Sequence, residues 1–306
     1  MRSVRDGFGK ALVELGKKNK NILAFSADLA GSVRTNWFAA EFPDRHFEVG
    51  IAEQNMAGIA SGLAACGKIP FIGSFAVFNP GRNLDQIRSS IAYSNMNVKI
   101  IGAHAGITVG QDGATHQALE DISITRALPN MTVIVPCDYD EMFNATIASA
   151  EHKGPVYIRS GRPKIPDITK PEDKFVIGKA KLMKQGKDVT IIACGIMVSK
   201  ALEAAELLEK DKISVRVINM HTIKPIDKDA IIKAAKETKA IITAEEHQVI
   251  GGLGSAVAEV VVQNHPVPME FVGIKDTFGE SGNGDELLEK YNLTSKDIVK
   301  AVKNLV

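Results

Sequence analysis

The sequence is poor in the residues that build disulfide frameworks, metal sites and membrane spans. Its 306 residues include only three cysteines (Cys66, Cys137 and Cys194), which are widely spaced and have no Cys-X-X-Cys or Cys/His pairing. Cysteines of this kind are typical of small core residues in a reduced, cytoplasmic protein. No apolar run approaches the roughly 20 residues that a membrane helix needs, and charges interrupt the N-terminal segment every few positions. We therefore expect neither a membrane span nor a secretion signal.

Neither sign of charge dominates the chain. Lys and Arg number 37, Asp and Glu number 36, and the formal net charge is +1. This balance argues against an extended nucleic-acid surface, which needs an excess of basic side chains. It leaves room for a local basic pocket that holds a small anion.

The sequence does contain a regular alternation of short β-branched runs and longer helical stretches. In the first half, strands are expected at 22–25, 47–49, 69–72, 98–101, 132–135 and 156–158, and helices at 5–18, 54–66, 83–93 and 139–150. This alternation is typical of a mostly parallel sheet covered by helices. We assign residues 1–160 to one such domain.

Residues 161–175 contain prolines and many charges but no periodicity, and we expect a linker there. The alternation then resumes over residues 176–306. Strands are expected at 189–193, 215–219, 240–244 and 269–272, and helices at 199–210, 229–236 and 255–263. Thr294 and Asp297 have the spacing of a capping box that opens a last helix. The sequence thus predicts an α/β protein of two three-layer αβα domains with mostly parallel sheets.

One candidate site residue is Glu53, in the segment EVGIAEQNMAG. It follows a predicted strand and begins a predicted helix, at the sheet edge where open α/β sheets bind ligands. Apolar neighbours would favour its protonated form, which can donate a hydrogen bond. On pattern alone, however, a glutamate that complements the helix dipole is the better-supported interpretation.

The glycine-rich run GAHAGITVGQDGATHQ, at 102–117, follows a buried strand and contains His104, Asp112 and His116. Loops at the edge of a rigid sheet often carry functional side chains. A solvated Gly/Asp turn fits the pattern equally well.

Together these two segments resemble the transketolase family, over 5–159 and more weakly through the second domain. The resemblance implies that Glu53 hydrogen-bonds the aminopyrimidine of thiamine diphosphate and that His116 lies beside the reacting carbon, as the two catalytic groups. It further implies that His104 binds the phosphate of a sugar phosphate and that Asp112 reads the C2 hydroxyl of the sugar.

The aromatic residues Phe75 and Phe78, in IGSFAVF, would by spacing alone be core residues. The resemblance implies that Phe78 stacks on the aminopyrimidine and that Phe75 supports it. The next residues, Asn-Pro-Gly-Arg at 79–82, lack the further aromatic of many transketolases, so the outer wall of the pyrimidine pocket is expected to differ. Asp28, in SADL, resembles a residue at the cofactor cleft and subunit interface.

Three further residues match the family's phosphate site, namely Arg5, Ser32 and Arg159. Each alone would be a structural residue, and the joint match together with His104 favours phosphate binding. In the second domain, glycines 251, 252 and 254 precede a helix, and we interpret them as a tight turn. His247 is expected to be a packing or interface residue.

The family's means of holding the diphosphate is missing. Transketolases bind it through Mg²⁺, with a Gly-Asp-Gly motif and a downstream asparagine, and neither QDG at 111–113 nor NGD at 283–285 is that motif. The chain also starts at the helix with Arg5, where the pyrimidine domain of a full-length transketolase would start. The resemblance therefore implies a separate N-terminal subunit that carries the diphosphate and Mg²⁺ ligands, an α2β2 assembly, and inactivity of the chain alone.

The activity implied is transfer of a two-carbon ketol unit from a ketose phosphate to an aldose phosphate, as in the pentose phosphate pathway. Two alternatives remain within the superfamily: an E1 β subunit of a 2-oxo-acid dehydrogenase, and a deoxyxylulose-phosphate synthase-like enzyme. A non-catalytic scaffold subunit is the alternative from another class.

Overall fold

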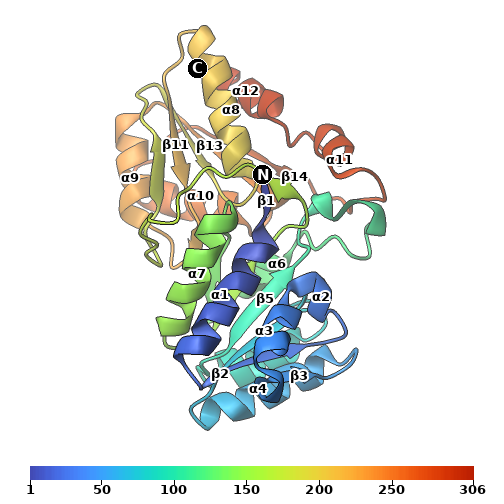
Figure 1. The fold of residues 1–306 in the computed structure, drawn as a ribbon. Coiled ribbons are helices and arrows are strands. Elements are labelled where there is room, and N and C mark those ends of the chain that lie inside the picture. The colour runs from blue at the N-terminus through green and yellow to red at the C-terminus, as the bar shows by residue number, and fades with distance from the viewer.

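The computed structural model describes residues 1–306 and contains two large sheets, each covered by helices (Figure 1). The first sheet consists, in spatial order, of β12 (Thr222–Lys224), β6 (Thr132–Ile134), β7 (Val156–Arg159), β5 (Lys99–Ala103), β4 (Ile69–Phe75), β2 (Ile22–Ser26) and β3 (His46–Glu48). The second consists of β14 (Met269–Ile274), β13 (Ile241–Gln248), β10 (Val189–Ala193), β11 (Val215–Asn219) and β9 (Lys181–Lys184). A two-stranded ribbon pairs β1 (Arg2–Ser3) with β8 (Lys164–Ile165).

Helices connect these strands. In the first half they are α1 (Val4–Lys18), α2 (Ala30–Val33), α3 (Thr35–Glu41), α4 (Glu53–Ala65), α5 (Leu84–Gln86), α6 (Asp121–Arg126) and α7 (Tyr139–Glu151). In the second half they are α8 (Met197–Lys210), α9 (Lys228–Glu237), α10 (Leu253–Asn264), α11 (Gly284–Lys290) and α12 (Ser295–Lys303). Two 3₁₀ segments, η1 (Pro43–Arg45) and η3 (Ile107–Asp112), and a π-helix, η2 (Ile87–Ala92), complete the set.

The first sheet is buried on both faces because successive side chains of a strand point to opposite sides. On β5, Ile100 belongs to the core that contains Met56 of α4, whereas its neighbour Ile101 belongs to the core that contains Phe8 of α1. Helices α1 and α7 lie side by side over that second face (Figure 1). Apart from β12, every strand of this sheet pairs in parallel. The predicted α/β class with mostly parallel sheets is confirmed.

The second sheet repeats this arrangement on a smaller scale. Strands β10, β11, β13 and β14 are parallel, and β9 adds an antiparallel edge. Ile191 packs into a core with Ala201 of α8, and the adjacent Ile192 packs into the core with Ile231 of α9. The predicted capping box of α12 is confirmed, since Asp297 accepts hydrogen bonds from both the backbone N–H and the hydroxyl of Thr294.

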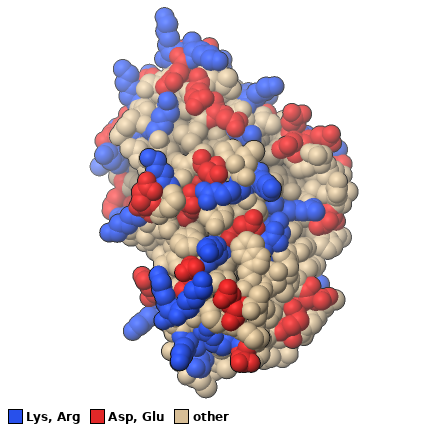
Figure 2. Space-filling model, viewed as in Figure 1, with Lys and Arg blue, Asp and Glu red and all other residues tan.

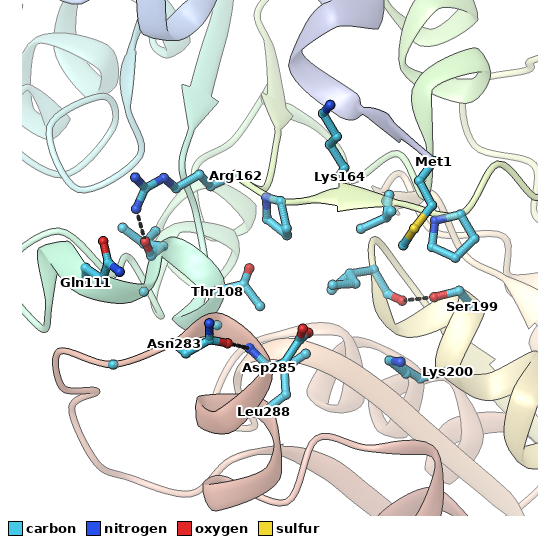
Figure 3. Close-up of a pocket in the computed structure, with 18 of the residues that line it drawn as sticks. Met1, Thr108, Gln111, Arg162, Lys164, Ser199, Lys200, Asn283, Asp285 and Leu288 are labelled. Carbon is cyan, nitrogen blue, oxygen red and sulfur yellow. Dashed lines mark hydrogen bonds between the residues drawn. The ribbon is translucent and has the colours of Figure 1, made fainter.

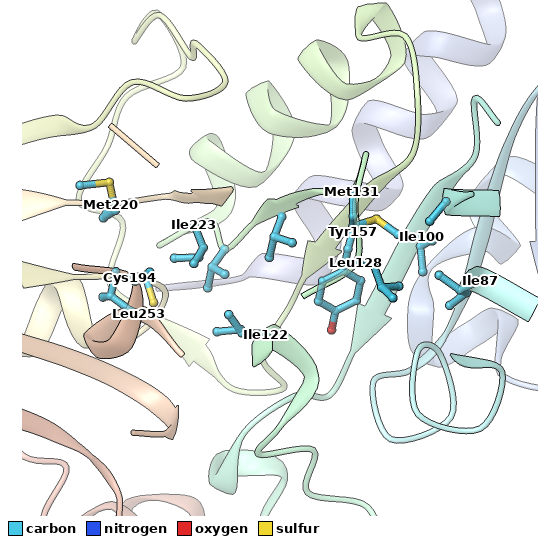
Figure 4. Close-up of a cluster of buried hydrophobic side chains, with 14 of the residues drawn as sticks. Ile87, Ile100, Ile122, Leu128, Met131, Tyr157, Cys194, Met220, Ile223 and Leu253 are labelled. Carbon is cyan, nitrogen blue, oxygen red and sulfur yellow. The ribbon is translucent and has the colours of Figure 1, made fainter. Parts of the chain in front are cut away.

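The two halves share one hydrophobic core. Strand β12, from the second half, pairs with β6 as the antiparallel edge of the first sheet. One cluster of 32 buried residues crosses the boundary, and Figure 4 shows Met220 and Leu253 of the second half in line with Ile122 and Tyr157 of the first. The two halves are thus packed together as a continuous body.

Some elements differ from the sequence expectation. The expected helix at 83–93 is a short turn, α5, followed by the π-helix η2. The expected linker contains β8, whose pairing with β1 fastens the N-terminus between the two halves. β9, β12 and α11 were not predicted, because short elements are specified by their tertiary partners more than by their own periodicity. No helix combines the length and apolar character that crossing a bilayer requires. Basic and acidic side chains are interspersed over the face shown in Figure 2.

Candidate functional site

Glu53 is the first residue of α4, and its side chain is 1% exposed. Its carboxylate accepts a hydrogen bond from the Ser74 hydroxyl at 3.3 Å and from Nη1 of Arg82 at 2.7 Å. The sequence suggested apolar surroundings for Glu53. The structure instead gives the buried carboxylate a cationic partner, Arg82, whose own side chain is 42% exposed.

An aromatic group lies at the end of β4 and in the turn that follows, and Arg82 joins it to this carboxylate, since its guanidinium carbon is 4.2 Å from the centroid of the Phe78 ring. The rings of Phe75 and Phe78 are close to parallel, with 11° between their planes and their centroids 6.2 Å apart. His104 stacks on Phe75 with 3.9 Å between centroids, and the His116 ring meets the edge of Phe78 at 5.5 Å. Four residues that the sequence singled out thus form one contiguous surface.

His104 is held in an unusual position after β5. It has φ = 53°, a left-handed conformation that non-glycine residues adopt only where the surroundings enforce it. Its side chain is 4% exposed, and its Nδ1 atom is buried without a hydrogen-bond partner. Its Nε2 atom lies 3.4 Å from Nη1 of Arg5.

Arg5 contacts His104, and the positive charges of Arg34 and Arg162 also act on it. We call Arg5, Arg34, Arg162 and His104 the basic cluster. Burial lowers the pKa of His104 to about 3, and the positive charges of Arg5, Arg162 and Arg34 contribute to that shift. Burial also lowers the pKa of Arg5 to about 10, with Arg34 adding to the effect. A buried imidazole with an unpaired nitrogen among three cations is a setting that favours an anionic ligand.

The basic cluster borders a cavity of about 520 Å³ between the two halves (Figure 3). Arg5 and Arg162 both line it, together with Thr108, whose hydroxyl is buried without a partner. The cavity floor comes from the second half, at the start of α8 and around Asp285.

Arg159, one of the three expected phosphate ligands, does not join the basic cluster. It is 4% exposed, and its Nε donates to Asp121 at 2.8 Å while its Nη2 donates to the Glu246 carbonyl at 2.8 Å. Burial acts to lower the pKa of Arg159, but the carboxylates of Asp121 and Glu246 outweigh it, so the pKa is raised. Arg159 is therefore an internal counterion between the halves, whereas Arg162, three residues on in the expected linker, lines the cavity.

The remaining candidates lie at the rim of the site. Ser32, in α2, meets the basic cluster through its carbonyl, which accepts from Arg5 Nη1 at 2.7 Å. Asp112 is exposed at the end of η3, with its carboxylate 3.8 Å from Arg162. Asp28 is exposed after β2 with φ = 59°, and its backbone N–H donates to Glu48 at 2.6 Å.

The glycine cluster at the start of α10 is closed by the chain itself. The Glu245 carboxylate accepts from the backbone N–H groups of Leu253 and Gly254, and burial raises the pKa of Glu245 to about 7. A Cβ at Gly252 would lie 2.1 Å from the Glu245 carboxylate, so the turn needs glycine there. His247 accepts from the backbone N–H of Ile122 in α6, across the boundary. The structure thus contains a tight turn at these glycines, and His247 packs at the boundary between the two halves, as expected from the sequence.

No three His, Cys, Asp or Glu side chains are gathered where they could hold a metal ion. The NGD segment serves a local purpose, since Asn283 caps α11 by accepting from the Asp285 N–H at 2.9 Å.

Comparison with known families matches both halves of the chain. The family described as "Transketolase, pyrimidine binding domain" covers residues 1–167, and "Transketolase, C-terminal domain" covers residues 178–298. The chain belongs to the transketolase family.

Its similar relatives include separate transketolase subunits. A protein of Methanocaldococcus jannaschii named as a transketolase C-terminal section is 49% identical, over 98% of this chain and 95% of that protein. A 6-deoxy-6-sulfo-D-fructose transketolase subunit of Clostridium sp. is 46% identical, over 97% and 92%. A subunit of the apulose-4-phosphate transketolase of Phocaeicola vulgatus is 41% identical, over 100% and 98%.

Solved structures agree with this membership. A split gene transketolase, described as an inactive beta4 tetramer, is 50% identical with a TM-score of 0.94, over 100% of this chain and 98% of that chain. The transketolase of Campylobacter jejuni is 26% identical with a TM-score of 0.85, over 99% of this chain but 46% of its own. The chain is thus a transketolase-type protein that matches separate C-terminal subunits along nearly their whole length.

Proposed function

We propose that this chain is the C-terminal subunit of a thiamine-diphosphate-dependent transketolase, with a division near residues 161–175 into pyrimidine-binding and C-terminal domains. The observation that carries the proposal is that one guanidinium, Arg82, contacts both the buried Glu53 carboxylate and the Phe78 ring, which is near-parallel to the ring of Phe75. A planar heterocycle that both stacks and hydrogen-bonds suits such a pair of surfaces.

The residues present fit the pyrimidine half of the cofactor. Glu53 would hydrogen-bond the ring nitrogen, Ser74 would orient the carboxylate, and Phe78 would stack on the ring while Phe75 supports it. When bound, thiamine diphosphate would supply the nucleophilic carbon needed to break a carbon–carbon bond of a ketose. Asp28, exposed after β2, is assigned to the cofactor cleft.

The substrate end of the site is the basic cluster. His104, Arg5 and Arg162 would hold the terminal oxyanion of the sugar, with Ser32 positioning Arg5 through its carbonyl. The names of the relatives suit this chemistry, because one specifies a sulfo-sugar and another a phosphorylated sugar. We assign the substrate class as ketoses and aldoses with a terminal phosphate or sulfonate.

Between these two ends lies His116. Its ring touches the edges of Phe75 and Phe78, and its Nδ1 lies 2.9 Å from the Thr115 hydroxyl. An imidazole there can accept and return a proton at a substrate oxygen. Asp112, exposed next to Arg162, is assigned to the hydroxyl next to the reacting carbon.

The diphosphate and Mg²⁺ would be held by a separate N-terminal subunit in an α2β2 assembly. Two observations support this: the chain lacks the Gly-Asp-Gly motif, and the split gene transketolase that it resembles is described as inactive as a beta4 tetramer. The Mg²⁺ ion needs hard oxygen ligands that this chain does not gather. The chain alone is then expected to be inactive.

The test is reconstitution with a transketolase N-terminal subunit that carries the Gly-Asp-Gly motif. We expect ketol transfer from xylulose 5-phosphate to ribose 5-phosphate with both subunits, thiamine diphosphate and Mg²⁺, and none with either subunit alone. Turnover of a 2-oxo acid instead would assign the chain to the E1 β class. Full activity of Glu53→Ala in the complex would leave the chain as a scaffold.

A further inference from the structure

Arg82 makes two contacts at once in the candidate pyrimidine site. Its Nη1 donates to the Glu53 carboxylate at 2.7 Å, and its guanidinium carbon lies 4.2 Å from the centroid of the Phe78 ring. These are the same two surfaces, a buried acceptor and a stacking ring, that the proposed function assigns to the aminopyrimidine. Arg82 is the only cation paired with Glu53.

A guanidinium group resembles an aminopyrimidine in the properties that matter here. Both are planar, both present N–H donors at the edge of the plane, and both stack on an aromatic face. Two planar groups cannot lie on the same face of Phe78 and reach the same carboxylate oxygen together. We propose that Arg82 is a built-in placeholder for the pyrimidine ring, which must leave before the cofactor binds.

The backbone around Arg82 restricts this movement to its side chain. The turn is tight, because a Cβ at Gly81 would lie 2.1 Å from the Val77 carbonyl oxygen. The next residue, Asn83, is fully buried and donates to the Glu53 carbonyl at 3.2 Å. The Arg82 side chain, 42% exposed, is free to rotate toward solvent while both neighbours stay fixed.

The placeholder has a physical reason. A carboxylate that is 1% exposed is costly to leave without a counterion, and Arg82 supplies one. The same ion pair occupies a carboxylate oxygen of Glu53 that the pyrimidine ring would need. The chain without cofactor is thereby held in a stable but non-catalytic arrangement, and the cofactor binds in competition with Arg82.

This inference rests on the proposed function, and the test separates the two. The reconstituted complex is titrated with thiamine diphosphate in the presence of Mg²⁺, and the dissociation constant is measured by calorimetry, independently of turnover. The variant is Arg82→Met, which keeps roughly the length of the side chain and its apolar contact with the ring but has neither the charge nor the planar donor group. Arg88→Met, an exposed arginine six residues on that makes no ion pair, is the matched control.

We expect Arg82→Met to bind thiamine diphosphate about tenfold more tightly than the wild type, and Arg88→Met to bind as the wild type does. Arg82→Lys keeps the charge but not the planar group, so its dissociation constant for thiamine diphosphate should lie between those of Arg82→Met and the wild type. Equal or weaker binding by a folded Arg82→Met variant would overturn the placeholder while leaving the proposed function intact. Failure of all four complexes to bind thiamine diphosphate would overturn the proposed function itself.

Discussion

The imidazole of His104 stacks on the phenyl ring of Phe75, with 3.9 Å between their centroids and 30° between their planes. This contact joins the two ends of the candidate site. Phe75 lies near-parallel to Phe78, and His104 belongs to the basic cluster, of which Arg5 and Arg162 line the cavity.

The burial of His104 predicts a stability that depends on pH. Its folded pKa of about 3 lies below its ordinary value, so between about pH 6.5 and pH 3 the unfolded chain binds a proton that the folded chain does not. The free energy of unfolding therefore keeps its full value, as far as His104 determines it, above about pH 6.5. Below that pH it decreases by roughly 1 kcal/mol per pH unit.

The check is urea unfolding between pH 7 and pH 4.5, with His104→Asn beside the wild type. Asparagine keeps a polar group and tolerates a positive φ, but it does not titrate. We expect a shallower pH dependence for the variant. Identical slopes for the two proteins would mean that His104 is not the buried neutral group described here.

We expect substitution of Arg159 to affect stability and substitution of Arg162 to affect substrate binding. Arg159→Met removes the cation from a buried ion pair and should lower the free energy of unfolding by about 3–5 kcal/mol. Arg162→Gln changes a partly exposed side chain at the cavity and should leave stability within about 0.5 kcal/mol. It should instead raise the KM for a phosphorylated sugar about tenfold or more, with less effect on substrates that lack the anion.

Thermal melts and steady-state kinetics of the reconstituted enzyme, run on both variants, decide this pair. The two assignments would be reversed by the opposite result. In that result Arg162→Gln lowers the stability of the protein, while Arg159→Met leaves stability unchanged and raises the KM for the sugar phosphate.

These two arginines also show which features of the site could be predicted from the sequence and which could not. The family motifs drew attention to Glu53, Phe75 and His104, which lie at or just after the ends of parallel strands of one sheet, and the structure brings Phe75 and His104 into contact. Whether an arginine at this end of β7 points to the cavity or to the interior depends on Asp121 and Glu246, which are distant in sequence. No local pattern contains that information.

Prediction of the secondary structure from the sequence has the same limit, because contacts distant in sequence are not visible in a local pattern. The strands β10 and β11 could be predicted to the residue, since both are rich in β-branched residues and buried along their whole length. Strand β12 could not, because three residues carry no periodicity and its partner β6 belongs to the other half of the chain. In the sequence, Arg82 stands out only as part of a segment that lacks an aromatic residue. The pairing of Arg82 with Glu53 depends on the shape of a turn, which the sequence does not reveal.

Gly106 is predicted to be intolerant of any side chain. It has φ = 91°, and a Cβ there would lie 2.3 Å from the buried carboxyl carbon of Glu246. Gly106→Ala should destabilise the chain by about 3 kcal/mol, since both the backbone and the packing oppose it.

Gly62 is the matched control. It lies on the exposed side of α4, and a Cβ added there would have nothing within 4 Å, so Gly62→Ala should stabilise by about 0.5–1 kcal/mol through helix propensity. Chemical denaturation of the two variants measures both effects. Equal stability of Gly106→Ala and the wild type would contradict the close approach of Glu246.

The shared core predicts that the two halves unfold together. Strand β12 crosses into the first sheet, and the 32-residue cluster contains Leu253 from α10 and Tyr157 from β7. Leu253→Ala, a truncation in the second half, should cost about 2–5 kcal/mol and should lower the hydrogen-exchange protection of β7 in the first half by the same amount as that of β13 in the second. Calorimetry of the intact chain should give one transition whose calorimetric and van't Hoff enthalpies agree. Loss of protection confined to the second half would show that the two sheets are energetically separate, and that the contacts across their boundary contribute little to the stability of the first.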